Sequence, residues 1–386
     1  MFTFSRKALS LAGAMLITAA LTPAGASGTE NGVRLLVHGQ LHGQATENEY
    51  VQTNLVSDIM SIPAEHHDPN LQNPWGVAFF PGGPFWISDN NDGLSTLYDG
   101  SGNGIGQPFV IPLPNGSPGG APTGIVWNDT LTGFIIPQAI AGAPKIQAIF
   151  IFATEDGTIA AWNPAFGQNA KIVIDNSQIP NAADGAVYKG LALGTNLSGN
   201  FLYATNFRAG TVDVFDSTFT QTSFGSNKFV DKMIPPGFAP FGIKNIEGNL
   251  FVTYALQNSD KHDDVAGPGN GFVDVFDTGG NLIQRFARHG TLNSPWGVAL
   301  APAGFGKFAG DVLIGNFGDG RIGAFDLETG RLEGQLRDPS GFTISIDGLW
   351  SLVFGGGLAS DPNTLYFTAG PNGEKDGIFG TLLPSL

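Results

Sequence analysis

The chain of 386 residues contains no cysteine, which excludes disulfides, thiolate catalysis and cysteine-ligated zinc or iron–sulfur sites. Charged residues are scarce at 13%, and 18 Lys and Arg stand against 33 Asp and Glu. The resulting net charge of −15 repels nucleic-acid phosphates and anionic lipid headgroups, so we expect neither as a partner. Cations or neutral ligands suit this surface better, although acidity also serves solubility alone.

The sequence also lacks an apolar run long enough for a membrane helix, which needs about 20 residues. Its longest apolar stretch, Ala8 to Leu21, follows Arg6 and Lys7 and precedes the A-x-A site Ala24-Gly25-Ala26. This order predicts a secretory signal peptide over residues 1–26, cleaved after Ala26, and a periplasmic or extracellular protein. An uncleaved N-terminal anchor is the alternative.

Complete catalytic signatures are missing as well. There is no G-x-S-x-G elbow, H-E-x-x-H pair or P-loop, and Asp156-Gly157 does not continue into an EF-hand loop. A Ser–His–Asp triad is assembled in space rather than in sequence, but six histidines give it little support.

What the chain has is a repeat. Its 56 Gly and 25 Pro occur at regular turn positions between apolar, β-branched and aromatic runs. Six short heads recur at intervals of 48 to 66 residues: Pro74-Trp75-Gly76-Val77, Pro122-Thr123-Gly124-Ile125, Tyr188-Lys189-Gly190-Leu191, Pro240-Phe241-Gly242-Ile243, Pro295-Trp296-Gly297-Val298 and Leu349-Trp350-Ser351-Leu352. Each is followed by a second strand-like run. The first five are also followed by a Gly…aromatic-Asp or -Asn element, which is truncated in the sixth copy, Gly377–Gly380. Such a period predicts an all-β, six-bladed β-propeller with blades of four strands.

The sixth blade has too little chain after Phe379 for a fourth strand. A propeller must close its ring to hide sheet edges, so we predict that Tyr50–Val56 supplies this outer strand. Residues 27–48 are then a flexible lead-in and residues 49–386 a single propeller domain, expected to be a monomer.

Several strings resemble a family of secreted bacterial proteins of unknown function. They are the Pro-Trp-Gly-Val-Ala heads, Ala153–Ile159, Asp263–Asp277 and Gly315–Ile322, and the resemblance covers about residues 50–383. In architecture the blades are also similar to NHL-type propellers and gluconolactonase-like hydrolases. The first resemblance implies an uncharacterised propeller; the second implies a cation at the channel mouth that polarises a lactone carbonyl. Many members of the bacterial family carry a C-terminal Pro-Glu-Pro sorting tail. This chain, ending at Leu386, does not show one, so we do not expect surface anchoring by that route.

The channel mouth of a propeller is lined by segments before the heads and by links between second and third strands. Those segments contribute Glu65–Asp68, Asp89-Asn90, Glu155-Asp156, Asn206 with Arg208, Asp260–Asp264 with His262, Asn316 and Asp347. Oxygen-rich sets of this kind suit Ca²⁺ or another divalent cation. The predicted metal ligands are Asp89, Asn90, Glu155, Asn206 and Asn316. Asn90, Asn206 and Asn316 are expected at equivalent places of blades one, three and five, so that their amides project toward one axis. Ordinary turn chemistry of Asn and Asp is the competing interpretation.

For an enzyme at this mouth, His67 or His262 is the candidate proton acceptor. Arg208 is the candidate residue for binding a substrate carboxylate through a bidentate ion pair. The aromatic heads, Trp75, Phe241, Trp296 and Trp350, indicate core packing rather than carbohydrate stacking.

Two functions therefore stay open. One is a secreted binding or scaffold module for an unknown extracellular ligand or protein, presenting the insertion Gln257–Asn270 and the channel mouth. The other is a metal-dependent, lactonase-like hydrolase at that mouth.

Overall fold

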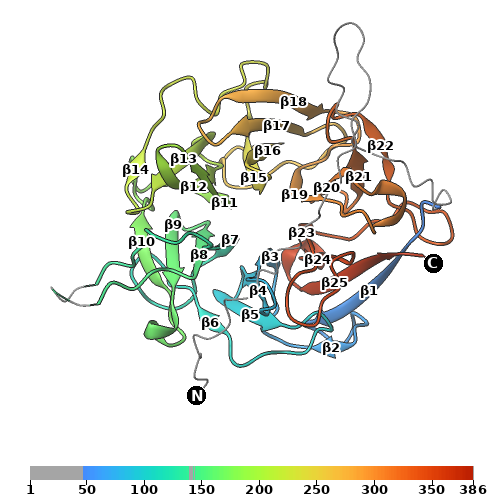
Figure 1. Cartoon of the computed structure of the whole chain (residues 1–386), viewed down its shortest axis with the longest axis horizontal. Helices are drawn as coiled ribbons and strands as arrows, with labels where there is room; N and C mark the ends of the chain where they lie inside the picture. The colour runs from blue at the N-terminus through green and yellow to red at the C-terminus, as the bar shows by residue number, and fades with distance from the viewer. Residues whose placement is uncertain (1–46, 139–141, 143, 386) are drawn as a thin grey trace, which may run out of the picture. The chain divides into compact units, whose positions relative to one another are not determined.

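The structure is a computed structural model that describes residues 47–138, 142 and 144–385. The predicted signal peptide and most of the lead-in lie outside the described residues. The described part is almost entirely β-structure arranged in six sheets (Figure 1). Beside the strands it has two 3-10 turns, η1 (Pro164–Phe166) and η2 (Gly306–Phe308), and one short helical segment, α1 (Pro371–Glu374).

Each sheet is one blade, and its strands follow one another from the ring centre outward. Blades one to three consist of β3 (Pro74–Ala78), β4 (Phe85–Asp89), β5 (Leu94–Tyr98) and β6 (Phe109–Val110); β7 (Pro122–Trp127), β8 (Phe150–Thr154), β9 (Thr158–Trp162) and β10 (Lys171–Asp175); and β11 (Tyr188–Asn196), β12 (Gly199–Asn206), β13 (Thr211–Asp216) and β14 (Gln221–Thr222).

Blades four to six follow the same plan. They consist of β15 (Phe238–Ile246), β16 (Asn249–Leu256), β17 (Phe272–Asp277) and β18 (Leu282–Arg288); β19 (Pro295–Leu300), β20 (Val312–Asn316), β21 (Ile322–Phe325) and β22 (Leu332–Gln335); and β23 (Leu349–Phe354), β24 (Leu365–Ala369), β25 (Ile378–Pro384), β1 (Tyr50–Ser57) and β2 (His66–His67).

The six innermost strands form a closed circle. β3 contacts β7, and the contacts continue through β11, β15, β19 and β23 back to β3, so every blade has two neighbours (Figure 1). The predicted six-bladed propeller is confirmed, and each head begins an innermost strand within two residues of its expected place.

The ring closes as predicted. β1 pairs antiparallel with β25 from Tyr50 opposite Pro384 to Ser57 opposite Ile378, so the N-terminal strand completes blade six. β2, which pairs parallel with β1, adds a fifth strand that the repeat did not predict.

The hydrophobic core lies between the blades. Ile159 of blade two packs in one buried cluster with Leu202 and Phe215 of blade three. The β-branched and aromatic side chains that favour strands therefore also supply the contacts between the sheets. No helix of the described residues is long and apolar enough to cross a membrane.

The head glycines allow the innermost strands of neighbouring blades to approach backbone to backbone. A Cβ on Gly124 would lie 2.3 Å from the backbone nitrogen of Leu191 in the next blade. A threonine hydroxyl bridges the equivalent gap between blades three and four: the Gly190 N–H donates to Thr205 Oγ1 at 2.7 Å, and that hydroxyl donates to the carbonyl of Phe241, also at 2.7 Å. The repeated glycine therefore has a packing role at the ring centre.

Gly124→Ala is expected to lower the free energy of unfolding by about 1–3 kcal/mol, because the new methyl group overlaps backbone atoms that cannot move independently. Gly104→Ala is the matched control, since a Cβ there meets no atom within 4 Å. Urea unfolding of both variants measures the difference. Equal midpoints would contradict the close-approach explanation.

Candidate functional site

The centre of the ring is filled with aromatic side chains. The buried cluster there contains Trp75, Phe207, Ala239, Phe241, Ala255, Trp296 and Trp350, with Phe317 packed against it. The indoles of Trp75 and Trp350 stack with 3.5 Å between ring centroids, and Trp296 lies edge-on to Trp75 at 5.9 Å. The aromatic heads are thus buried, as expected for core packing. They pack between adjacent blades, and they also contact heads of blades that are not neighbours, as Trp75 of blade one does with Trp296 of blade five.

One head carries a lysine where four others carry an aromatic residue. Lys189 begins the innermost strand of blade three, and only 2% of its side chain is exposed. Its ammonium lies over the ring of Trp75, 5.1 Å from the centroid, and over that of Phe207 at 5.9 Å. The charge is therefore held directly against the aromatic cluster, at the end of the channel where the heads begin.

Lys189 bridges two carboxylates at this mouth. Its Nζ forms an ion pair with Glu155 Oε1 and lies 3.5 Å from Asp263 Oδ1. Burial by itself lowers the pKa of Lys189, but Glu155 and Asp263, with a contribution from Glu374, outweigh it and raise the pKa. The lysine is therefore a cation at neutral pH, held between acidic groups.

The carboxylates are held by further hydrogen bonds. Asn90 donates through Nδ2 to Glu155 Oε2 at 2.8 Å. Asn73 donates through Nδ2 to Glu374 Oε2 at 3.0 Å and accepts from Trp350 Nε1 at 3.0 Å. Burial raises the pKa of Glu374, and the bond from Asn73 opposes this in part. The network therefore joins the mouth to the aromatic cluster below it.

The insertion Gln257–Asn270 reaches this mouth, as predicted for a link between second and third strands. It is anchored because Gln257 Nε2 donates to the carbonyl of Phe207 at 2.5 Å and Asn293 Oδ1 accepts the Gly267 N–H at 2.7 Å. The loop brings His262 Nδ1 to 2.7 Å from Asp263 Oδ1. That hydrogen bond is the main cause that lowers the pKa of Asp263 to about 2, against the opposing effect of burial.

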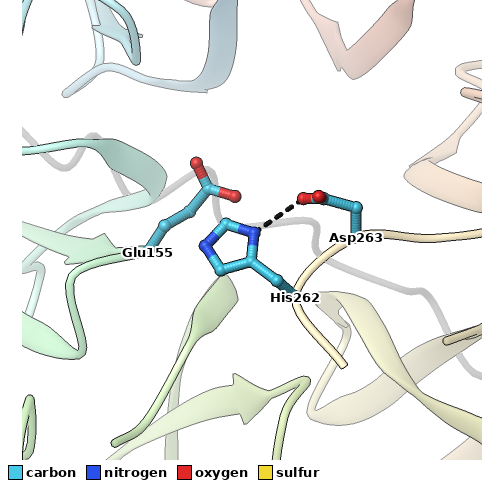
Figure 2. Close-up of side chains that lie close together, drawn as sticks. All are labelled: Glu155, His262 and Asp263. Atoms are coloured by element: carbon cyan, nitrogen blue, oxygen red, sulfur yellow. Dashed lines mark hydrogen bonds and ion pairs between the residues drawn. The ribbon is translucent and has the colours of Figure 1, made fainter. Parts of the chain in front are cut away.

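Figure 2 shows the imidazole of His262 between the carboxylates of Glu155 and Asp263. Each of the three side chains offers one ligand atom, and these atoms lie within 4.8 Å of one another; no other group of three His, Asp or Glu in the described ranges does so. A divalent cation of the zinc or calcium type could use such donors. Lys189, however, already places a positive charge against Glu155 and Asp263.

Of the five predicted metal ligands, Asn90 and Glu155 meet at this mouth. Asp89 is fully buried in blade one, where it accepts hydrogen bonds from the Thr96 amide at 2.7 Å and hydroxyl at 3.2 Å, and burial raises its pKa well above the usual value. Asn206 donates to Asp213 at 3.0 Å within blade three.

Asn316 is likewise bound within its own blade. It donates to the Thr291 carbonyl at 2.7 Å and to Asp319 Oδ1 at 3.0 Å. Asn206 lies opposite Tyr188, and Asn316 lies opposite Pro295. In blade one the residue opposite Pro74 is Asp89. Asn206 and Asn316 are therefore equivalent to Asp89, which precedes Asn90 by one residue. The assumed equivalence with Asn90 was wrong by one position.

The predicted catalytic residues are spread out. His262 is part of the cluster at the mouth, whereas His67 lies on β2 at the outer edge of blade six with its Nδ1 3.0 Å from Ser57 Oγ. Arg208 donates from Nη1 to the Gly185 carbonyl at 3.0 Å, and its Nε is buried without a partner among the described residues.

Sequence reasoning missed Lys189, Asn73 and Glu374. The signal for Lys189 was present, because it is the only charged residue at the second head position. Asn73 and Glu374 are separated by 301 residues, and nothing in the repeat links them.

No family model matches the chain. Among known structures, a glucose dehydrogenase superposes with a TM-score of 0.50 at 13% identity, covering 87% of this chain and 99% of that one. The virginiamycin B lyase of Staphylococcus aureus superposes with a TM-score of 0.45 at 14% identity, covering 87% and 99%. At such identities the likeness concerns the fold alone.

Two uncharacterized proteins of Acanthamoeba polyphaga mimivirus are much closer in sequence. One is 33% identical over 325 residues, which is 83% of this chain and 76% of the relative. The other is 32% identical over 336 residues, which is 86% and 85%. These relatives are viral, and the likeness to secreted bacterial proteins stays a prediction. The chain belongs to the same family as these two uncharacterized mimivirus proteins.

Proposed function

We propose that this protein is a secreted binding module that recognises an extracellular partner with the face of the ring carrying the insertion Gln257–Asn270. The main support is the bridge that Lys189 makes between Glu155 and Asp263 on top of the aromatic cluster. The charge of the carboxylates is partly compensated, and the aromatic cluster lies directly below them. This mouth is therefore better suited to surface recognition than to enclosing a small substrate.

The insertion has the properties of a recognition loop. Its ends are anchored by Gln257 and by the bond from Gly267 to Asn293, whereas its tip, Ser259–Lys261, is exposed. Beside the tip, Val265 is 40% exposed and the side chain of Asp263 is 62% exposed. A loop that is already ordered loses little conformational entropy on binding, which favours affinity.

A loop-exchange experiment tests this proposal. Ser259, Asp260 and Lys261 are replaced by glycine and Val265 by serine, which leaves Gln257 and Asp263 in place. The control replaces the exposed Leu197 and Ser198 in the β11–β12 turn, at the opposite end of its blade. Each immobilised protein is tested for the extracellular proteins that wild type captures. We expect the loop variant to capture at least about tenfold less of them, and the control to capture as much as wild type. Both melting temperatures should stay within about 2 °C of the wild-type value. Retention by the loop variant would refute the proposed face.

The competing function, a metal-dependent hydrolase, is supported by the grouping of Glu155, His262 and Asp263. A cation there must sit beside the ammonium of Lys189, which repels it.

A further inference from the structure

A second lysine interrupts the repeat, one blade further on. Lys244 lies on β15, three residues after the aromatic head Phe241. The equivalent residues of the other five blades are all Ala or Val: Ala78, Val126, Ala192, Ala299 and Val353. Three residues of strand span about 10 Å, so Lys244 lies well below the heads, away from the mouth that Lys189 occupies.

Lys244 lines two adjoining cavities in the lower part of the channel. The smaller, about 40 Å³, has Trp296 of the aromatic cluster in its wall. The larger is about 370 Å³ and extends to the exposed Asp129. Val77, Ile125 and Leu191 line both cavities together with Lys244. Lys244, whose side chain is half-buried, therefore lies at the junction of the two spaces, where most of the neighbouring side chains are apolar.

The two channel lysines differ in their surroundings. Among the described residues, no carboxylate lies within ion-pair distance of Lys244 Nζ, and this nitrogen makes no hydrogen bond with them. Asp129 is the only other ionisable residue in the walls of either cavity, and it forms no ion pair in this part of the chain. Burial lowers the pKa of Lys244, whereas three carboxylates raise that of Lys189.

An amine that lies among mostly apolar side chains without a counter-ion is neutral in a larger fraction of molecules than a surface lysine, and its nitrogen lone pair is then free to react. The larger cavity has the volume of a small-molecule site, and its walls suit a short apolar group. From this geometry we propose that Lys244 forms a second site, independent of the loop face, which takes small aldehydes or ketones with an apolar substituent and holds them as a Schiff base.

The reaction is a condensation. The Nζ lone pair forms a bond to the carbonyl carbon, and the carbonyl oxygen leaves as water with the two hydrogens of the amine. The product is an imine, with no change of oxidation state, and water reverses the step. No oxidant, metal or further reactant is needed.

Butanal with sodium cyanoborohydride tests the site on the intact protein, because this reagent reduces the imine to a stable butyl amine. Peptide mapping then gives the rate at each lysine. At pH 7 we expect Lys244 to be labelled at least about tenfold faster than the exposed Lys261 and the ion-paired Lys189, with saturation as butanal is raised. Near pH 10 the advantage over Lys261 should shrink, because surface lysines also lose their protons there.

Two further comparisons make the result decisive. Acetaldehyde lacks the longer apolar group, so labelling of Lys244 should need a higher concentration of acetaldehyde than of butanal to saturate. In the loop variant described above, butanal should label Lys244 at the wild-type rate. Lys244→Met should lose the fast site alone. If Lys244 reacts no faster than Lys261 at pH 7, or reacts without saturation, the inferred site is wrong, whatever the outcome of the loop-exchange experiment.

Discussion

Truncating Tyr50 to alanine is expected to lower the free energy of unfolding by about 3–5 kcal/mol, as for other fully buried aromatic residues. Tyr50 has no exposed surface; its ring lies 4.9 Å from that of Phe305, and its hydroxyl donates to the Phe305 carbonyl at 3.2 Å. Its backbone N–H donates to the Arg337 carbonyl at 2.8 Å. One residue of the closing strand thus ties blade six to blade five.

Urea unfolding measures this effect, with Val51→Ala as the matched control. Val51 is the next residue of β1, is 46% exposed and points to the opposite face, so its truncation should change stability by no more than about 0.5 kcal/mol. A chain without β1 should be less stable still, because β25 would become an open edge. Equal stability of the Tyr50 and Val51 variants would mean that the ring does not depend on this closure.

Lys189→Met is expected to destabilise the protein by about 3–5 kcal/mol, because removing one partner of a buried ion pair leaves the other charge uncompensated. Glu155 loses its ion pair in this variant, while its bond from Asn90 remains. Lys244→Met is the matched control, since it removes a lysine of the same channel that pairs with no described carboxylate. That change should be neutral or stabilising.

The effect of Lys189 depends on pH with a definite sign. Its pKa is raised in the folded protein, so its contribution to stability is complete below the pKa of the unfolded chain and is lost as pH rises through the folded pKa. The difference between wild type and Lys189→Met should accordingly be constant near neutral pH and shrink in alkaline solution. A difference that grows with rising alkalinity would contradict the ion-pair explanation.

The repeat was enough to predict the architecture, because five of the six heads contain the glycine that close approach of neighbouring inner strands requires, and the sixth has the small residue Ser351 in its place. Closure by Tyr50–Val56 followed from the missing fourth strand. The buried state of Trp75 could be predicted from its apolar area, but its contact with Trp296 across the axis could not, since the repeat does not say which heads meet.

The mouth was predicted less well. Asn206 and Asn316 lie opposite Tyr188 and Pro295, as Asp89 lies opposite Pro74, so matching them to Asn90 by residue type placed them one position off. Both amides bind groups of their own blades, as Asn and Asp at turns commonly do. Lys189 was overlooked because its partner Asp263 lies 74 residues away on the insertion.

We propose that Lys189, rather than a metal ion, compensates the carboxylates at the mouth. The test measures metal content and melting temperature of purified wild type and Lys189→Met, with chelator and with millimolar calcium, magnesium, manganese or zinc. Binding to the folded state alone raises stability by RT ln(1 + [L]/Kd). We predict no stoichiometric metal and a shift below about 1 °C for wild type, with a larger shift for Lys189→Met. A stoichiometric metal in wild type, whose removal by chelator lowers the melting temperature, would contradict the claim and favour the hydrolase.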